Sequence, residues 1–477
     1  MASSIIDRSG LKAASALQRP AWSVPLSAGS ALLVLDVFGF AMLWPVVLLT
    51  WGPPLQGLAG ALTVVLYPSA AIGAFYAVGL YRRDAGVSLR RALSRLPLAA
   101  IMASAGPSAG LLLFAPPAAI PGLLAGGCAL GVGVWTRFMF DAFRRRGFFS
   151  RRVLILGAGK RAWDLVWVLQ KEGRTLGYRV HFLHDPALGP IDPRLADGSA
   201  GPMLSAGPGG IAEAVQIVRP DEIVVAPDER RGMDLQGLLD CKIAGYPVSD
   251  YLGFIEREVR RVDIKRIELG WLLYSDGFTM GPLDRALKRL MDVGVSLAVL
   301  LLTSPFLVAA MVAIRLQDRG PALYRQTRIT RNGRPFQILK LRTMRVDAER
   351  SGAAWAQVGD ARITRLGTFL RRTRLDEVPQ LFNVLRGDMA FVGPRPERPE
   401  FIDMLAGHLP LYRERHAAKA GLTGWAQVNY PYGASVDDAR SKLSYDLYYV
   451  KNFSILFDLL IILQTIRVVL WPGGGAR

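Results

Sequence analysis

Cysteine and histidine are scarce in this sequence. Only two cysteines and four histidines occur among 477 residues. Cys128 falls in a long apolar stretch and Cys241 in a mixed one, so nothing pairs them as a disulfide, and the histidines are not spaced as metal ligands are. The sequence therefore gives no indication of a disulfide framework or of a cysteine or histidine metal site.

Acidic residues are outnumbered as well. The chain has 58 Lys and Arg against 39 Asp and Glu, a net charge of +19, and its mean hydropathy is +0.25. Such a hydropathy is too high for an ordinary soluble enzyme, so part of the chain must lie in lipid. Nucleic acid is a common partner of basic proteins, but the basic segments lack the interleaved aromatic residues that stack on bases, and we expect no nucleic-acid partner.

Long apolar stretches account for the hydropathy. Four of them occupy the first third of the chain, each close to the ~20 residues that a bilayer core requires. Basic residues precede the first stretch, separate the second from the third and follow the fourth, whereas the loops "TWGPPLQG" and "FAPPAAIPG" carry no charge. By the positive-inside rule, both ends of this block face the cytoplasm. We predict a four-helix transmembrane domain over residues 1–146, with spans near 25–51, 57–80, 96–115 and 118–141.

Asp36 stands alone in the first span. An ionisable side chain is costly inside a membrane, so it marks either a functional site or a polar contact that packs the helices together. We favour the second interpretation.

A glycine turn opens the middle of the chain. The stretch "RRVLILGAGKRAWDLVWVL" has the apolar strand, the turn and the helical pattern of a nucleotide-binding βα unit, and "EIVVA" at 222–226 reads as another strand. These patterns predict a Rossmann-like, doubly wound α/β domain over 147–280. Gly157 and Gly159 are present, but Ala162 takes the third glycine position. The alternative is a turn that packs strand against helix and binds no ligand.

A fifth apolar stretch, at 293–314, has basic residues on both flanks, which places both of its ends on the cytoplasmic side. Ser304 and Pro305 lie near its middle, where proline removes a backbone hydrogen bond and a serine hydroxyl can satisfy the freed carbonyl. We predict a re-entrant membrane helix over 288–315; an ordinary kinked span is the alternative. The segment "FSILFDLLIILQTIRVVLW", interrupted by polar residues, suits a helix lying at the membrane interface.

Basic residues crowd the region from 336 to 430. Arginine forks match phosphate oxygens, so their convergence predicts a diphosphate substrate, although any single one could be a surface charge. We expect five of the basic residues in this region to bind phosphate: Lys340, Arg342, Arg362, Arg371 and Arg395.

Two adjacent acids, Asp376 and Glu377, lie within this basic region. Pro379 is tolerated in the first turn of a helix, so a helix should begin close to Asp376, and its N-terminus and the arginines should keep that carboxylate ionised. An ionised carboxylate can attack phosphorus. Glu377 is placed to hold Mg²⁺ together with substrate phosphates. The alternative is that both acids only cap a helix and pair with arginines.

The motifs "LKRLMDV", "SPF", "KLRTM", "DARITRLGTFLRRTRLDEVPQLFNVLRGDMAFVGPRPE" and "GLTGWAQVNYPYG" resemble the bacterial sugar transferase family, the polyprenyl-phosphate phosphoglycosyl transferases. The resemblance covers about 195 residues and implies a catalytic domain over 283–477, mostly helical. It implies that Asp376 is the nucleophile, Glu377 the Mg²⁺ ligand, Arg371 and Arg395 phosphate contacts, and Ser304-Pro305 the membrane-helix break. The variant "WAQVNYPYGAS", with "YDLYYVKN", is similar to a subgroup associated with PEP-CTERM exopolysaccharide loci.

The resemblance further implies transfer of a sugar 1-phosphate from a UDP-sugar to undecaprenyl phosphate, with release of UMP, at the cytoplasmic face of the bacterial inner membrane. Membrane lipids are expected partners, and a homodimer is left open. Two other classes remain. A membrane-tethered nucleotide-sugar oxidoreductase or dehydratase would use the middle domain, but no tyrosine has a lysine four residues on. A non-catalytic scaffold for polysaccharide assembly would have no use for carboxylates held among phosphate-binding residues.

Overall fold

The computed structural model describes residues 28–51, 57–81, 89–114, 121–146, 150–171, 177–264, 277–278, 280–345, 360, 362–431, 433 and 435–470. The basic residues before the first apolar stretch and most of the loops between the predicted spans lie outside these ranges. The chain separates into two compact units, Met1–Val259 and Arg260–Arg477.

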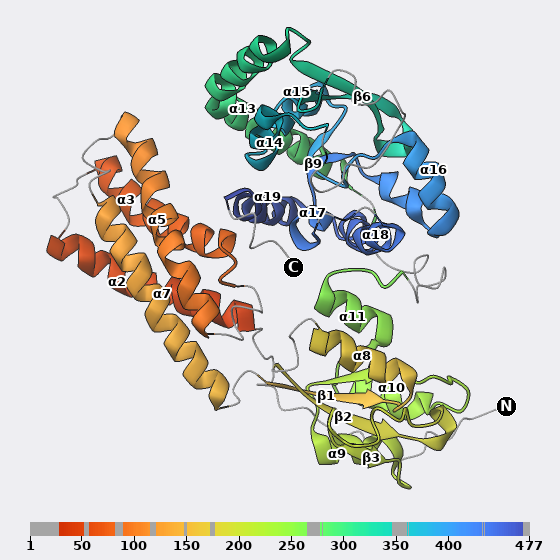
Figure 1. Cartoon of the computed structure of the whole chain (residues 1–477). Coiled ribbons are helices and arrows are strands. Elements are labelled where there is room, and N and C mark those ends of the chain that lie inside the picture. The colour runs from red at the N-terminus through yellow and green to blue at the C-terminus, as the bar shows by residue number, and fades with distance from the viewer. Residues whose placement is uncertain are drawn as a thin grey trace. The chain divides into compact units, whose positions relative to one another are not determined.

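Four apolar helices form the first part of the chain and pack side by side as a bundle (Figure 1). Its core is built from aromatic and small residues, among them Phe40, Trp44, Tyr67 and Phe75. Small side chains such as Ala99 and Ala103 allow the helices to approach closely. The helices are α2 (Ala28–Trp51), α3 (Gly57–Ala77), α5 (Leu89–Phe114) and α7 (Gly122–Arg145).

Fewer of the described N-terminal helices are long and apolar enough to cross a membrane than the sequence predicted. Among the described residues, three helices are long and apolar enough to cross a bilayer, over Gly29–Thr50, Gly122–Arg145 and Pro282–Asp318. The described apolar part of α3 is shorter, Thr63–Ala77, and α5 begins with arginines. The predicted set of four crossing helices is therefore confirmed only in part.

Asp36 pairs with a basic residue of the last helix of the bundle, 101 residues further along the chain. Its Oδ1 accepts hydrogen bonds from Arg137 Nη1 at 2.5 Å and from Thr136 Oγ1 at 2.6 Å. Asp36 and Arg137 are almost fully buried, and the guanidinium also lies over the Phe75 ring. The contact joins α2 to α7, so the prediction that Asp36 packs the helices together is confirmed.

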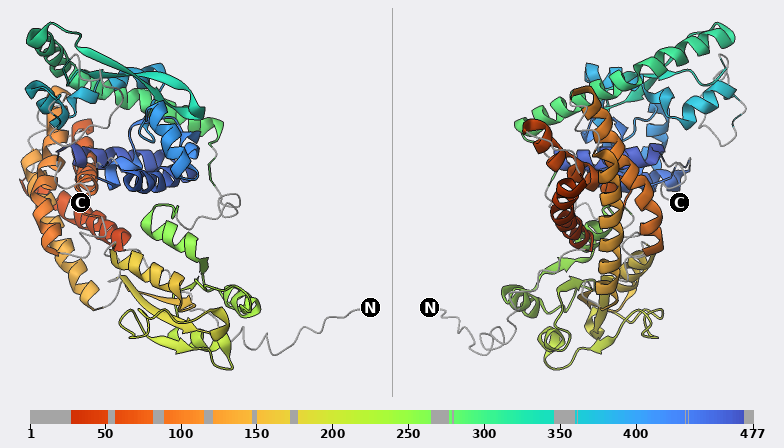
Figure 2. Two further views of the ribbon diagram at one scale, coloured as in Figure 1. Left: turned by 45° about the vertical axis from the view of Figure 1, so that its right-hand side comes forward. Right: turned by 90° about the vertical axis from the view of Figure 1, so that its left-hand side faces the viewer.

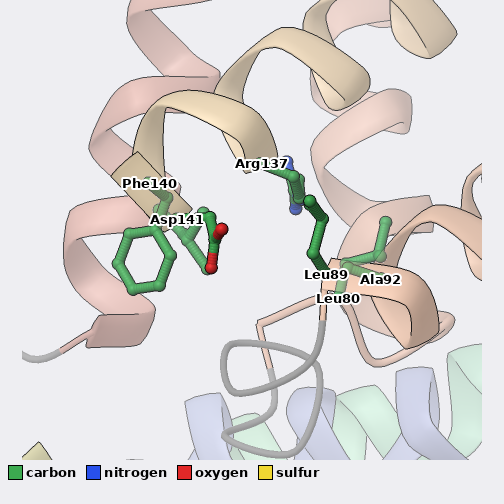
Figure 3. Close-up of a pocket in the computed structure, with 7 residues that line it drawn as sticks. Leu80, Leu89, Ala92, Arg137, Phe140 and Asp141 are labelled. Atoms are coloured by element: carbon green, nitrogen blue, oxygen red, sulfur yellow. The ribbon is translucent and has the colours of Figure 1, made fainter. Parts of the chain in front are cut away.

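Arg137 also lines a small pocket of about 10 Å³, together with Asp141 of the same helix and Leu89 and Ala92 of α5 (Figure 3). This volume is near the minimum that a single water molecule needs. The pocket is therefore too small to hold a lipid headgroup or a nucleotide.

A five-stranded parallel sheet with helices on both faces forms the middle of the chain, as predicted (Figure 1). The strand order is β3-β2-β1-β4-β5. Along β1, Val153 and Ile155 pack against α8 and α11, whereas Leu154 and Leu156 pack against α9 and α10. The elements are β1 (Arg151–Leu156), α8 (Lys160–Lys171), β2 (Tyr178–His184), β3 (Met203–Ser205), α9 (Gly210–Val218), β4 (Glu222–Val225), α10 (Leu235–Ile243), β5 (Val248–Asp250) and α11 (Tyr251–Val259).

The second unit is mostly helical and contains two small sheets. Strands β6 and β7 form an antiparallel hairpin, and β8 pairs with β9 in parallel. The elements are α13 (Pro282–Asp318), β6 (Leu323–Ile329), β7 (Pro335–Leu341), α14 (Arg365–Arg372), α15 (Gln380–Arg386), β8 (Ala390–Val392), α16 (Pro399–His408), β9 (Gly421–Thr423), α17 (Trp425–Asn429), α18 (Val436–Lys451) and α19 (Ile455–Leu470).

The predicted Ser-Pro break lies inside α13, which is one continuous helix from Pro282 to Asp318. Pro305 cannot donate a hydrogen bond to the carbonyl of Leu301, four residues earlier. Ser304 Oγ donates to that same carbonyl at 2.9 Å, so the freed acceptor is satisfied as the sequence predicted. The helix changes direction along its length (Figures 1 and 2), and most of its apolar side chains are exposed.

Helix α19 buries polar side chains and exposes apolar ones, whereas a helix on the surface of a soluble protein does the opposite. Its polar residues Asp458 and Gln464 are buried against the rest of the unit, whereas Leu456 and Leu459 are exposed. Asp458 accepts from Lys288 Nζ at 2.6 Å and from the Tyr449 hydroxyl at 2.8 Å. The polar interruptions therefore serve contacts inside the protein rather than contacts with water, and the outward face is apolar.

Candidate active site

The acidic pair lies on a tight turn between two helices. Leu375–Glu377 forms one turn of 3₁₀ helix, and α15 begins at Gln380, directly after Pro379. Arg374, just before this turn, has a left-handed backbone with φ of 62°. Such a conformation is uncommon for a residue other than glycine and lets the chain reverse sharply after α14. The predicted helix start near Asp376 is confirmed.

Cations contact Glu377 directly. Its Oε1 lies 2.7 Å from Arg395 Nη2 and 3.5 Å from Lys340 Nζ, and its Oε2 lies 3.9 Å from Arg374 Nη1. Burial alone would raise the pKa of Glu377, but the charges of these three neighbours outweigh that effect and hold the pKa well below its ordinary value. Glu377 is therefore ionised at neutral pH.

The pKa of Asp376 is shifted in the opposite direction, upward. It is buried, and desolvation together with the charge of Glu377 raises its pKa to about 6, against the pull of Lys340, Arg371 and Arg374. The sequence predicted that the helix N-terminus and the arginines keep Asp376 ionised. The carboxyl group is still mostly ionised at neutral pH, but its pKa is raised rather than lowered, because the nearest cations contact Glu377 and burial outweighs the more distant charges. A pH of 7 is only about one unit above this pKa, so most but not all Asp376 side chains are ionised there.

Lys340 is shared by the two acids. It extends from β7, and burial lowers its pKa, an effect that Glu377 opposes and Arg395 reinforces. Asn383 of α15 ties this strand to the helix that follows the acids, because its side chain bonds the backbone of Leu339 and of Gln337 at 3.0 and 2.8 Å. The position of Lys340 is thus fixed relative to the acidic turn.

The other predicted phosphate-binding residues differ in their positions. Arg371, at the end of α14, acts on Asp376 and is oriented by a 2.9 Å hydrogen bond from its Nε to Thr343 Oγ1. Arg362 is paired with Asp360 at 2.6 Å and holds the pKa of that acid at about 2. Arg342 pairs with Asp318 at the end of α13. Lys340, Arg371 and Arg395 therefore surround the acids, whereas Arg342 and Arg362 are each engaged by another carboxylate.

Sequence reasoning missed two cations at this site. Arg374 approaches Glu377, and Arg328 of β6 lies near Lys340 and Arg395, close enough for their charges to interact. Arg374 belongs to the basic region from 336 to 430 but is not among the five residues that the sequence predicted to bind phosphate. Arg328 could have been found from the alternation in "LYRQTRI", because Tyr324, Gln326 and Arg328 fall on one face of that strand and Tyr324 pairs across the hairpin with Lys340.

The site is built against the apolar helix α13. Leu307, Ala310 and Ile314 of that helix pack with Leu341 of β7 and Leu370 of α14, and Leu375 adjoins the same cluster. The elements that carry Lys340, Arg371 and Asp376 are therefore held directly on the helix with the exposed apolar surface.

The glycine turn of the α/β domain is filled by the chain itself. Asp228, which follows β4, accepts hydrogen bonds from the backbone amides of Lys160 and Arg161 at 2.7 and 2.9 Å. These amides open α8 between β1 and β4, where the strand order reverses and where a doubly wound sheet usually binds a nucleotide phosphate. The carboxylate thus takes the place of a ligand anion, which favours the interpretation that the turn is structural.

The described residues contain no cluster of three or more His, Cys, Asp or Glu side chains that could hold a metal ion by themselves. Cys128 and Cys241 are both buried free thiols. An ion at Glu377 would therefore need oxygen ligands from the substrate as well, which is how Mg²⁺ is commonly held with phosphates.

Comparison with known proteins points to the same region. Residues 283–472 match the bacterial sugar transferase family. The chain is 44% identical over 196 residues to a UDP-glucose:undecaprenyl-phosphate glucose-1-phosphate transferase of Caulobacter vibrioides, covering 40% of this chain and 73% of that protein. It is 31% identical over 335 residues to a Klebsiella pneumoniae protein of the same name, covering 69% and 70%.

The name of a further relative specifies a different sugar. The chain is 41% identical over 268 residues to a UDP-N-acetylgalactosamine-undecaprenyl-phosphate N-acetylgalactosaminephosphotransferase of Aeromonas hydrophila. This match covers 54% of the present chain and 61% of the relative. With its matched catalytic segment and with relatives covered over most of their length, this chain belongs to the bacterial sugar transferase family.

Proposed function

We propose that the protein transfers a sugar 1-phosphate from a UDP-sugar to undecaprenyl phosphate and releases UMP, as the first membrane step in building an exopolysaccharide repeat unit. The observation that carries the proposal is the acidic pair among Lys340, Arg371 and Arg395, built against the apolar helix α13. The names of the relatives supply the substrate class, and they divide between glucose and N-acetylgalactosamine.

The chemistry assigned to Asp376 is a double displacement. A carboxylate oxygen attacks the phosphorus that carries the sugar, and the bond from that phosphorus to the bridging oxygen breaks, so that UMP leaves with the electron pair. An oxygen of undecaprenyl phosphate then attacks the same phosphorus and the carboxylate leaves. The products are the lipid diphosphate sugar and free Asp376.

The surrounding cations stabilise the negative charge that develops on the phosphates during this reaction. Arg371 and Lys340 lie near Asp376 and are placed to neutralise the phosphoryl oxygens and the departing UMP. Glu377 stays ionised and would hold Mg²⁺ together with the donor diphosphate, where the ion supplies positive charge to the phosphates. Its carboxylate oxygens are ligands of the hard type that Mg²⁺ prefers.

The proposed membrane arrangement is supported by the apolar surfaces and by the basic residues that flank the apolar segments. We assign α13 as a re-entrant helix, four N-terminal helices as spans, and the site to the cytoplasmic side of the inner membrane. The exposed apolar side chains of α13 and α19 support contact with membrane lipids. A site packed on α13 can receive a water-soluble donor and a lipid-embedded acceptor at the same level of the membrane.

A donor assay without acceptor tests the proposal. Purified protein should be incubated with Mg²⁺ and either UDP-glucose or UDP-N-acetylgalactosamine, each labelled in the sugar, and UMP should be measured. We expect up to one equivalent of UMP and an equivalent of label retained on the protein, both requiring Asp376. Continuous UMP release should appear only when undecaprenyl phosphate is added. UMP release that requires the lipid, with no label on the protein at any time, would contradict the covalent step and leave direct transfer.

A further inference from the structure

The loop that carries Arg395 is held by its backbone at every residue from Gly393 to Glu397. The Gly393 amide donates to the Thr423 carbonyl at 2.9 Å, and the Pro394 carbonyl accepts from the Gly421 amide at 2.9 Å. The carbonyl of Glu397 accepts from the Ile329 amide at 3.1 Å. Pro394 and Pro396 have no amide hydrogens, so the middle of the loop must be anchored through its carbonyl groups.

Arg328 holds one of these carbonyls. Its Nη1 donates to the Pro396 carbonyl at 3.2 Å and lies 3.5 Å from Glu397 Oε2. The rest of the guanidinium is fixed by Gln326 Oε1, which accepts from Nε at 3.1 Å and from Nη2 at 2.7 Å. Arg328 is therefore oriented by its own strand and directed at the loop.

Arg415 holds the neighbouring carbonyl. Its Nη2 donates to the carbonyl of Arg395 at 2.9 Å and to Asp446 Oδ2 at 2.7 Å, and its Nη1 bonds the Tyr412 hydroxyl at 3.0 Å. The side chains of Arg415 and Asp446 are 5% and 2% exposed. A buried arginine in this setting cannot move without leaving Asp446 as an uncompensated charge.

With the backbone of the loop fixed by these contacts, the Arg395 side chain is directed at the acidic pair. The Arg395 side chain is about one third exposed and reaches Glu377 at 2.7 Å. Its backbone is fixed by Arg415, and the next residue is fixed by Arg328. Small displacements of such a group are costly, because a binding group must be held within a fraction of an ångström of its working position.

We propose that Arg328 and Arg415 are positioning residues that hold the two carbonyls of the Arg395-Pro396 segment and so aim the Arg395 guanidinium at Glu377 and the donor diphosphate. The inference rests on the proposed function. Neither arginine needs to contact substrate. Arg328 acts from the hairpin that carries Lys340, so it also couples the two cations that flank Glu377.

A double-mutant cycle tests the coupling between Arg328 and Arg395. Arg328→Gln, Arg395→Ala and the double variant should be compared for Mg²⁺-dependent binding of UDP, which needs no turnover, and for UMP release from the active UDP-sugar. If Arg328 acts through Arg395, Arg328→Gln should weaken UDP binding about tenfold in the wild-type background and less than about twofold when Arg395 is already alanine. Equal losses in both backgrounds would overturn the inference.

Matched controls separate positioning from folding. Arg325→Gln changes an exposed arginine on the opposite face of the same strand, and Arg413→Gln changes an exposed arginine two residues from Arg415. Both should bind UDP as the wild type does. Arg328→Lys should recover only part of the binding, because lysine keeps the charge but lacks the fork that bonds Gln326 and the loop together.

The wild type separates failure of the inference from failure of the proposed function. A wild-type protein that neither binds UDP nor releases UMP from any UDP-sugar would refute the proposed function. A wild-type protein that does both, combined with additive losses in the cycle, would refute only the positioning role. Arg415→Lys, combined with Arg395→Ala in a second cycle, tests the other arginine and should show the same coupling. Should Arg415→Lys prove too unstable to purify, the cycle on the less buried Arg328 still decides whether Arg395 is positioned through the backbone of its loop.

Discussion

Two adjacent carboxylates have different properties in this protein because their neighbours differ. Glu377 takes the direct contacts with Arg395, Lys340 and Arg374, so its negative charge is compensated. Asp376 is buried beside that compensated charge, and its pKa rises to about 6. A carboxylate that is ionised at neutral pH but has a raised pKa is a better nucleophile than one locked into an ion pair, which agrees with the role proposed for Asp376.

Replacement of Asp376 by asparagine should abolish activity without loss of stability. A raised pKa means that the folded protein binds the proton of Asp376 more tightly than the unfolded chain does, so ionisation of this group costs stability as pH rises through about 4 to 6. The neutral amide removes that cost. We expect Asp376→Asn to release no UMP and to have a Tm at pH 7.5 equal to or above that of the wild type. Asp437→Asn, at an exposed acid, is the control for activity. A lower Tm together with substantial turnover would indicate a structural acid.

The rate of UMP release in the first turnover should depend on pH through Asp376. The reactive form is the carboxylate, so its fraction is nearly complete above pH 7, is one half near pH 6 and falls about tenfold for each unit below that. Quenched-flow measurement of UMP at saturating donor and Mg²⁺ checks this profile. Bound cations would shift the midpoint downward. A rate that rises as pH falls below 6 would exclude the carboxylate as nucleophile.

At the scale of elements, the glycine turn of the α/β domain shows how a familiar pattern can serve packing. Gly157 has a φ of 104°, and a Cβ on Gly159 would lie 2.2 Å from the Asp228 carboxylate. Ala162, in the third glycine position, is fully buried between sheet and helix. The close approach of the loop after β4 is therefore sufficient to require both glycines.

Gly159→Ala should disturb folding more than catalysis. The added methyl group would displace Asp228 from the start of α8 and leave the amides of Lys160 and Arg161 without that acceptor. We expect a Tm lower by several degrees, reduced membrane yield, and UMP release per folded molecule within about twofold of the wild type. Purified wild type should also carry no nicotinamide by absorbance and mass spectrometry. Stoichiometric NAD(P), or loss of turnover at an unchanged Tm, would restore a catalytic role for this domain.

At the scale of the whole molecule, the membrane arrangement decides whether the site and both substrates can meet. The proposed re-entrant α13 returns the chain to the cytoplasmic side, and its two ends carry basic residues. A crossing helix would instead place β6, β7 and the acidic turn on the periplasmic side.

Cysteines introduced at Leu290 and Gln317 report on this arrangement. Both positions are exposed on α13, one before Pro305 and one near the C-terminal end of the helix. In intact cells we expect neither cysteine to react with a membrane-impermeant maleimide added from the periplasm, and both to react in inverted vesicles. The two native cysteines are buried and provide the background. Periplasmic labelling at position 317 alone would show that α13 crosses the membrane.

Local patterns in the sequence determined the elements of this protein. Hydrophobic period and length placed the helices, the glycine turn followed β1, and Pro379 set the start of α15, because each of these depends on a few neighbouring residues. Even the satisfaction of the Leu301 carbonyl by Ser304 was predictable, since the two residues are three apart on one helix. The acidic pair was visible for the same reason.

Only the tertiary structure decided which distant charges meet. Asp36 pairs with Arg137 across 101 residues, Asp228 reaches the start of α8 from 68 residues away, and Arg415 reaches Asp446. In a chain with 58 basic residues, sequence alone cannot rank the partners of a given acid, because the choice depends on which elements pack together and on how much water they exclude. The same packing placed the nearest cations on Glu377, and burial raised the pKa of Asp376.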